Sequence, residues 1–266
     1  MNTYTHGHAE AVLRSHRWRT AANSAAYLLP HLDDGQRLLD VGSGPGTITA
    51  DLAREVREVV ALEVTEEAAA LTRAELDRQG VTNATVVVGD VHALDLELLG
   101  GEPFDVVHAH QVLQHLTEPV AALREMRRVA RPGGIVAVRD ADFHGMSWYP
   151  SIPELDEWME LYQRIARRNG AEPDAGRRLV SWAQAAGFTD VAPTSSNWLY
   201  ATGQQRRWQA RVWGERVLHS AFADQALEYG FATPAELARI SAGWHRWGST
   251  DDGWFLIPNG EVIARA

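Results

Sequence analysis

Residues 37–52 read RLLDVGSGPGTITADL: a short apolar run, a glycine-rich turn and a helix-compatible segment. Glycines in such a turn let backbone amides approach a ligand with no side chain in the way. They stand at positions 42, 44 and 46, which gives the spacing G-x-G-x-G. The dinucleotide fingerprint G-x-G-x-x-G would need a further glycine at position 47, which is Thr47. The turn therefore indicates a nucleotide-like ligand and disfavours a nicotinamide dehydrogenase.

The segments around this turn alternate between two types. Short β-branched runs, typical of strands, occupy residues 37–41, 58–63, 84–89, 104–109 and 135–139. Helix-length segments connect them: Thr65 is a predicted N-cap, Gly80 ends that helix, Thr117 precedes another, and residues 131–134 stop it. Strict alternation predicts an α/β fold, a Rossmann-like doubly wound parallel sheet that binds ligands at the carboxyl ends of its strands.

The flanks divide the chain into four expected parts. Residues 1–32 read as a helical N-terminal lid, and residues 33–145 as the sheet core. Residues 146–186 read as a helical insertion of two helices. Residues 187–266 hold two further strands, near 188–200 and 254–264, with a tryptophan-rich helical insert over 204–247.

Composition narrows the function classes. The 266 residues include no cysteine, and reading the sequence finds no lysine, so all 25 basic residues are arginine. This excludes thiolate metal sites, Schiff-base lysines and the phosphate-binding lysine of P-loop enzymes. The net charge of −10 disfavours a nucleic-acid partner, since phosphate backbones are bound through basic faces. The N-terminus lacks a secretory signal, and no apolar run reaches membrane-spanning length. We expect a cytoplasmic protein with no membrane partner; a homodimer stays open.

Acidic residues end three of the predicted strands. Asp40 ends the first, Glu63 the second and Asp90 follows the third. At the carboxyl edge of a parallel sheet, Glu63 is placed to accept both hydroxyls of a ribose, and Asp90 to accept a hydrogen bond from an adenine amino group. Each residue taken alone also fits a turn or a helix cap. Together, around one glycine turn, they indicate an adenosine-containing ligand.

At these residues the chain resembles the class I S-adenosylmethionine (SAM)-dependent methyltransferases. The resemblance covers roughly residues 37–140 and includes LLDVGSGPG at 38–46, Glu63, Gly89-Asp90 and RPGG at 131–134. Within that class the chain is similar to the branch of ubiquinone and menaquinone C-methyltransferases and many natural-product methyltransferases. The resemblance implies a seven-stranded sheet with the last strand antiparallel, SAM as cofactor and S-adenosylhomocysteine (SAH) as product. The insert between the last two strands departs from the family, which usually closes a hairpin there.

The resemblance also implies a set of cofactor-binding residues. In the core these are Asp40, Gly42, Ser43, Gly44, Gly46, Thr47, Glu63, Val64, Gly89, Asp90, Val91, Ala109, His110, Gln111 and His115. In relatives an N-terminal helix folds over the cofactor, so Tyr4 and Arg19 are further candidates for the cofactor and His8 for the substrate. An ordinary packing helix is the alternative for this segment.

Methyl transfer from a sulfonium requires alignment of the nucleophile, exclusion of water and a group that accepts any proton released. His110 and His144 are the candidate bases, because histidine titrates near neutrality. Instead of acting in catalysis, His115 could form a hydrogen bond to the backbone or the cofactor, and His108 could be a packed core residue. His108 and His110 share one strand face, a geometry that can ligate zinc, but no further ligand set is apparent, so we predict no metal.

The methyl acceptor is expected to be a small, planar or apolar molecule. Asp142, Trp148, Tyr149 and Trp198 are its candidate contacts, and Trp208 and Trp213 are further aromatic residues that fit a flat pocket. Three alternatives stay open: a SAM-fold protein that binds cofactor without methylating, a nucleotide-dependent oxidoreductase, and a nucleic-acid methyltransferase. Charge disfavours the last, and so does the absence of an Asn-Pro-Pro-Tyr type motif at 109–112.

Overall fold

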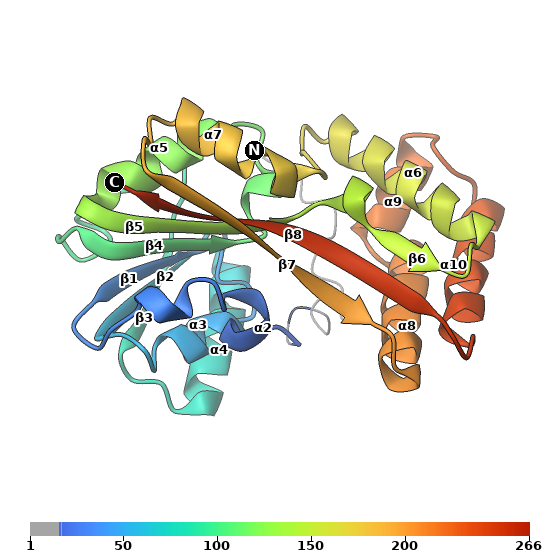
Figure 1. The fold of residues 1–266 in the computed structure, drawn as a ribbon, viewed down its shortest axis with the longest axis horizontal. Helices are drawn as coiled ribbons and strands as arrows, with labels where there is room; N and C mark the ends of the chain where they lie inside the picture. Colours follow the sequence, from blue (N-terminus) through green and yellow to red (C-terminus); the bar gives the residue numbers. More distant parts are fainter. Residues whose placement is uncertain (1–15, 17) are drawn as a thin grey trace.

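A mixed sheet forms the centre of the molecule in the computed structural model, which describes residue 16 and residues 18–266. Its strands are β1 (Arg37–Val41), β2 (Glu58–Glu63), β3 (Ala84–Val88), β4 (Phe104–His110), β5 (Ala130–Ala141), β6 (Ser147–Tyr149), β7 (Val191–Tyr200) and β8 (Trp254–Arg265). The order is β3-β2-β1-β4-β5-β8-β6, with β7 on the other side of β8. Strands β1 to β5 pair in parallel and β8 runs antiparallel to β5 (Figure 1). The predicted doubly wound fold with an antiparallel last strand is confirmed.

Helices cover both faces of the parallel part. One face carries α2 (Ala21–Ser24), α3 (Thr47–Leu52) and α4 (Glu66–Gln79), and the other carries α5 (Pro119–Val129) and α7 (Leu179–Ala185) (Figure 1). The short 3₁₀ helices η1 (Leu29–His31), η2 (Leu113–His115) and η4 (Ala175–Arg178) lie along the connections. Successive residues of a strand pack against the helices on opposite faces of the sheet, because their side chains alternate in direction. Leu38 packs in the core with Leu52 of α3, whereas Leu39 packs with Leu123 of α5.

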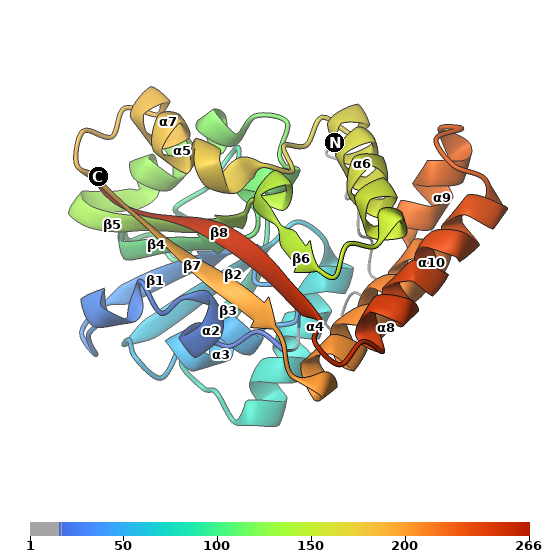
Figure 2. The same ribbon diagram turned by 45° about the vertical axis from the view of Figure 1, so that its right-hand side comes forward.

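A second hydrophobic core lies beside the sheet. It is built by η3 (Phe143–Gly145), α6 (Pro153–Arg168), α8 (Gly203–His219), α9 (Ala221–Glu228) and α10 (Pro234–Gly248), which Figure 2 shows to one side of the parallel strands. The paired ends of β7 and β8 reach into it, because Trp198 pairs with Ile257 and Tyr200 with Phe255, beyond the part of β8 that pairs with β5. The long β7–β8 pair thus joins the sheet to the helical layer.

Some local predictions hold and others need correction. Thr65 caps α4 by accepting the Ala68 amide, as predicted, at 3.2 Å. Residues 147–149 were expected in a helical insertion but form β6, because they pair with residues 254–256 of β8. The helical insert over 204–247 is divided into α8, α9 and α10 by the N-caps Ser220 and Thr233.

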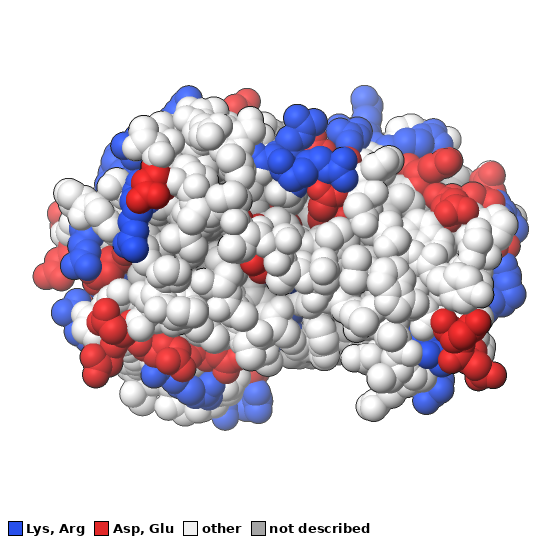
Figure 3. Space-filling model, viewed as in Figure 1, with Lys and Arg blue, Asp and Glu red and all other residues white. Residues whose placement is uncertain are grey.

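The outer surface carries charges of both signs. On the face drawn in Figure 3, basic and acidic side chains alternate around the rim, and uncharged surface extends across the middle. In the part of the chain that the structure describes, no helix has the length and apolarity needed to cross a membrane.

Candidate active site

A cavity of about 920 Å³ opens at the carboxyl ends of β1 to β4. Its volume lies at the upper end of the range of small-molecule pockets. The structure brings together in its wall most residues that the sequence proposed for the cofactor. They are Arg19, Asp40, Gly42, Ser43, Gly44, Thr47, Glu63, Val64, Gly89, Asp90, Val91, His110, Gln111 and His115.

The glycine turn is held in the left-handed backbone region. Gly42, Gly44 and Gly46 have φ angles of 70°, 57° and 83°. A Cβ atom on Gly42 would lie 2.5 Å from Cγ2 of Val112, whereas one on Gly44 would meet no protein atom within 4 Å. Gly46 does not line the cavity; it precedes α3 and packs against Thr72. The turn therefore needs glycine for two reasons, backbone conformation at all three positions and close packing at positions 42 and 46.

We expect Gly42→Ala to destabilise the fold more than Gly44→Ala. Both substitutions place a side chain in the left-handed region, which costs roughly 1–2 kcal/mol, but only the methyl group at position 42 collides with Val112. Gly42→Ala should lower the free energy of unfolding by about 2–4 kcal/mol, and Gly44→Ala by about 1 kcal/mol. Urea unfolding of both variants measures this, and equal losses would contradict the close approach to Val112.

Glu63 connects the end of β2 to the glycine turn. Its Oε1 accepts the Gly44 amide and, at 3.4 Å, the Ser43 hydroxyl, while Oε2 accepts the Val64 amide at 3.3 Å. Burial raises the pKa of Glu63, and the two amides act in the opposite direction. A buried carboxylate that lines the cavity and accepts hydrogen bonds suits a ligand with neighbouring hydroxyl groups.

Asp90 lies at the rim of the same cavity with a partner that the sequence reasoning missed. Its Oδ1 accepts the His92 backbone amide at 2.9 Å and lies 2.8 Å from His92 Nδ1. The hydrogen bond from that amide lowers the pKa of Asp90. His92 also lines the cavity. The sequence could have predicted the contact, because His92 stands in the turn two residues after Asp90, where an aspartate commonly accepts such a hydrogen bond.

Asp40 and His108 form a buried pair behind the turn. His108 Nδ1 lies 2.8 Å from Asp40 Oδ1, and the Thr49 hydroxyl donates to Asp40 Oδ2 at 2.6 Å. Among the described residues, no group of three His, Cys, Asp or Glu side chains is arranged to hold a metal ion. His108 thus adopts the packed role, with its ring anchored on β1.

His110 ends β4 at the cavity wall. The residue is 7% exposed, and within residues 16 and 18–266 neither ring nitrogen has a hydrogen-bond partner. Burial lowers the pKa of His110 well below its usual value, and the Arg139 and Arg19 charges act in the same direction. The imidazole is therefore neutral near pH 7, with a nitrogen lone pair to offer to a substrate proton.

Gln111 follows His110 in a strained conformation. Its φ of 54° lies in the left-handed region, which non-glycine residues seldom adopt. Its side chain accepts from Arg19 at 2.7 Å and donates to Asn259 of β8 at 3.3 Å. These bonds connect the N-terminal segment to the sheet at the site, and strain of this kind concentrates at functional positions.

Two further titratable groups lie near this wall. Burial lowers the pKa of His115 to about 3, and the Arg19 charge adds to the effect. Burial raises the pKa of Asp140 on β5 to about 8, although its Oδ1 accepts the Gln114 amide at 3.2 Å. Asp140 is therefore largely protonated in the folded protein at pH 7, and His115 is neutral.

Asp140 gives a pH-dependent stability prediction. The pKa of Asp140 is raised in the folded state from its ordinary 3.8, so between about pH 4 and 8 the folded protein holds one more proton than the unfolded chain. Its contribution to stability is lost as the pH rises through this window. We expect Asp140→Asn to gain about 3–4 kcal/mol relative to wild type between pH 5 and pH 8. Urea unfolding across this range tests it, and a pH-independent difference would contradict the raised pKa.

A narrow slot adjoins the cavity and shares His16, Arg19 and Gln111 with it. The slot is about 50 Å³, and aromatic side chains of β7 and α8 form much of its wall: Trp198, Tyr200, Trp208 and Trp213. Trp198, 7% exposed, lies 5.8 Å from His110 between ring centroids. The structure thus brings three tryptophans that the sequence proposed for a flat pocket into one slot, and one of them, Trp198, lies beside His110.

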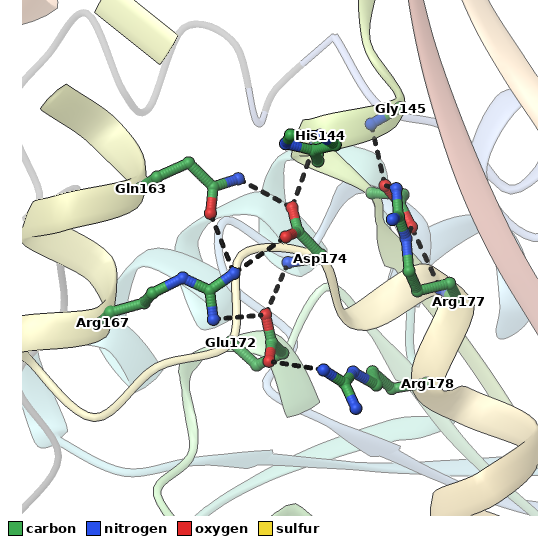
Figure 4. A network of polar contacts seen from close by, with 9 residues as sticks. His144, Gly145, Gln163, Arg167, Glu172, Asp174, Arg177 and Arg178 are labelled. Carbon is green, nitrogen blue, oxygen red and sulfur yellow. Dashed lines mark hydrogen bonds and ion pairs between the residues drawn. The ribbon is translucent and has the colours of Figure 1, made fainter. Parts of the chain in front are cut away.

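Other predicted residues lie away from both hollows. Ala109 is buried in the sheet core. His144 is exposed, and its backbone amide donates to Asp174 at 2.8 Å in the polar network of Figure 4. Asp142 caps η3 and pairs with Arg177 at 2.5 Å. Trp148 stacks on Phe255, and Tyr149 is 57% exposed. Tyr4 and His8 lie outside the described residues.

The path of β6 explains why Trp148 and Tyr149 line neither hollow. This strand carries residues 147–149 along the outer end of β8, on the side opposite β7, so Trp148 packs into the second core and Tyr149 faces outward. The sequence also missed Arg216, which lines the slot. The sequence could have indicated this position, because Arg216 stands at helical spacing from Val212 and Trp213 and so shares their buried face of α8.

Comparison with known proteins identifies the family. The family described as "Methyltransferase domain" matches residues 32–207. The chain belongs to this methyltransferase family. The family expected from the glycine turn and the acidic strand ends is therefore confirmed.

Individual relatives agree with this assignment. An uncharacterized methyltransferase of Schizosaccharomyces pombe is 33% identical, over 98% of this chain and 95% of its own. A demethylmenaquinone methyltransferase of Renibacterium salmoninarum is 28% identical, over 69% of this chain and 78% of its own. Among solved structures, a phosphoethanolamine N-methyltransferase of Haemonchus contortus, with phosphomonomethylethanolamine and SAH bound, matches with a TM-score of 0.57 and 16% identity, over 96% of this chain and 57% of that one. The last similarity concerns the fold.

Proposed function

We propose that this methyltransferase transfers the methyl group of SAM to an oxygen, nitrogen or activated carbon of a small planar acceptor in the cytoplasm. One observation carries the proposal: the glycine turn, Glu63, Asp90 and His110 line one cavity. An aromatic slot adjoins that cavity at Gln111. A net charge of −10 favours a small molecule over nucleic acid as acceptor.

The residues of the larger cavity fit SAM. Glu63 supplies a buried carboxylate for the ribose hydroxyls, and Asp90 with the Val91 backbone lies where an adenine would be read. Gly44, in the turn before α3, has no protein atom within 4 Å of its Cβ position, so a ligand can approach its backbone closely. Arg19, which donates a hydrogen bond to Gln111, and His115 also line this cavity. When bound, SAM supplies an activated methyl group on a sulfonium.

The chain's own residues then position the acceptor and accept its proton. His110 is neutral, and its ring nitrogens have no hydrogen-bond partner among the described residues, so a ring nitrogen can accept a hydrogen bond from an acceptor hydroxyl. The burial and charges that lower its pKa make the ring a weak base, so it takes the proton only as the methyl group is transferred and the acceptor becomes more acidic. Trp198 packs beside this ring and limits access of water. Gln111, fixed by Arg19 and Asn259, holds the end of β4 in place. His144 takes no part in this proposal.

Calorimetric titration with SAM and with SAH tests the function. We expect both to bind at micromolar concentrations in a single site and to raise the melting temperature. NAD and NADP serve as controls that contain adenosine and ribose but lack the sulfonium chain. Failure of SAM and SAH to bind at millimolar concentration, or tighter binding of a nicotinamide dinucleotide, would refute the proposal.

A further inference from the structure

Asp140, at the end of β5, binds the backbone of η2. Its Oδ1 accepts the amide of Gln114 at 3.2 Å, and the Gln114 carbonyl accepts the amide of Glu172 at 2.9 Å. Asp140 is fully buried, and Gln114 is 3% exposed. The backbone of Gln114 is therefore held on both sides, and rotation of its side-chain amide is the freedom that remains at this position.

The side chain of Gln114 contacts His115, which lines the larger cavity. Nε2 of Gln114 lies 3.1 Å from Nε2 of His115. An amide nitrogen only donates, so His115 Nε2 accepts this hydrogen bond. Burial lowers the pKa of His115 to about 3, so the ring is neutral near pH 7 and carries its single proton on Nδ1. The contact with Gln114 thus selects one tautomer of a ring in the cavity wall.

Two buried oxygens of this group lack a donor among the described residues. They are Oε1 of Gln114 and Oδ2 of Asp140. Buried oxygens normally take part in a hydrogen bond, and one proton on Asp140 Oδ2 satisfies both of them by donating to Gln114. Burial favours this proton, because it raises the pKa of Asp140 to about 8.

We infer that Asp140 and Gln114 are positioning residues for His115: the protonated carboxyl of Asp140 donates from Oδ2 to Gln114 Oε1, and Gln114 donates from Nε2 to His115 Nε2. This chain keeps the proton of His115 on Nδ1, so the ring retains an N–H donor for its other contacts. Neither Asp140 nor Gln114 lines the cavity. The inference rests on the proposed function and adds to it two residues behind the wall that orient a cofactor-site histidine.

Loss of the Asp140 proton to solvent reverses the chain. An ionised carboxylate needs a donor, so the Gln114 amide turns over and presents Nε2 to Asp140. Oε1 of Gln114 then faces His115, which releases the proton on Nδ1 and gains one on Nε2. The ring thereby exchanges a donor for an acceptor at Nδ1 without a change of charge.

Charged and titratable groups of several elements surround Asp140. On the other face of the sheet, beside Arg139, lie His110 of β4 and Glu261 of β8. The remaining groups are Arg19 in the N-terminal segment, Tyr27 before η1, His115 of η2 and Arg177 of η4, which pairs with Asp142. The Arg139 and Arg19 charges lower the pKa of Asp140, but burial outweighs them. Burial lowers the pKa values of His110 and His115 and raises that of Tyr27, so the proton that leaves near pH 8 is that of Asp140.

Nitrogen NMR of protein with isotope-labelled histidine tests the chain without any ligand. The two tautomers give distinct Nδ1 and Nε2 signals, and the His115→Gln variant identifies those of His115. We expect the Nδ1–H tautomer at about pH 6 and the Nε2–H tautomer at about pH 9.5. A His115 ring with its proton on Nε2 at about pH 6, or with one tautomer across the whole range, would overturn the inference.

Matched variants then test the two positioning residues. Asp140→Asn keeps a donor toward Gln114 at every pH, because its amide nitrogen replaces the carboxyl O–H, so the Nδ1–H tautomer should persist to about pH 9.5. Gln114→Leu should no longer hold the proton on Nδ1. Asp34→Asn, which replaces an exposed carboxylate, should titrate like the wild type. A wild-type transition in Asp140→Asn refutes the role of Asp140, and an unchanged tautomer in Gln114→Leu refutes that of Gln114. If a variant does not fold, the wild-type titration decides.

The affinity for SAH gives the functional readout. Between about pH 7 and about pH 9.5 the wild type should lose about threefold to tenfold more affinity than Asp140→Asn, because one hydrogen bond from His115 is lost. The comparison cancels the titration of the SAH amino group, which is common to both proteins. Equal profiles, or a gain by the wild type, would overturn the positioning role. Absence of SAH binding at every pH would instead refute the proposed function, and the NMR titration would still decide the inference.

Discussion

Glu63→Ala should weaken SAH binding by at least about 100-fold, because the variant loses the carboxylate proposed to accept two ribose hydroxyls. Each hydrogen bond to a charged acceptor contributes roughly 1.5–3 kcal/mol. The carboxylate also holds the Gly44 and Val64 amides, so its removal loosens the turn around the ligand. Calorimetric titration with SAH measures the loss. Glu63→Gln should bind with intermediate affinity, because it keeps an acceptor oxygen but not the charge.

The control for Glu63 is Glu67→Ala. Glu67 is exposed in the first turn of α4, four residues along the chain, and does not line the cavity. The Glu67→Ala variant should bind SAH with wild-type affinity. Urea unfolding of both variants separates a binding defect from a folding defect. A Glu63→Ala protein that is folded and binds SAH as tightly as wild type would remove this carboxylate from the cofactor site.

Local signals were enough to predict which residues come together in the wall of the larger cavity. The glycine spacing, the acidic strand ends and the N-cap at Thr65 each occupy a few consecutive residues, and parallel strands bring their carboxyl ends to one edge. Once the alternation of strand and helix was read, the wall containing Gly42, Glu63 and Asp90 followed from topology. The resemblance also implied roles for these residues, which stay predictions, and the family match confirms the family.

The acceptor half depended on pairing between distant residues. Trp148 and Trp198 look equivalent in the sequence, yet β7 directs Trp198 to the slot through its pairing with residue 257, whereas β6 places Trp148 beside Phe255. His144 and His110 both follow predicted strands, but η3 turns His144 toward Asp174 and solvent. Register and the path of a long insert are fixed by contacts far apart in the chain, and local patterns carry little information about them.

His110→Ala should lower kcat by about 100-fold or more and change SAH affinity by less than about fivefold. The neutral ring at the end of β4 is the proposed proton acceptor, so its loss affects the chemical step more than cofactor binding. Release of SAH from SAM with an acceptor that the wild type methylates gives kcat, and calorimetry gives affinity. His144→Ala is the matched control, because it removes an exposed histidine that lines neither hollow and should change kcat by less than about twofold. If His144→Ala lost activity and His110→Ala retained it, the base would be His144, after β5, and not His110, at the end of β4. The ring contact between Trp198 and His110 would then no longer indicate where the acceptor receives the methyl group.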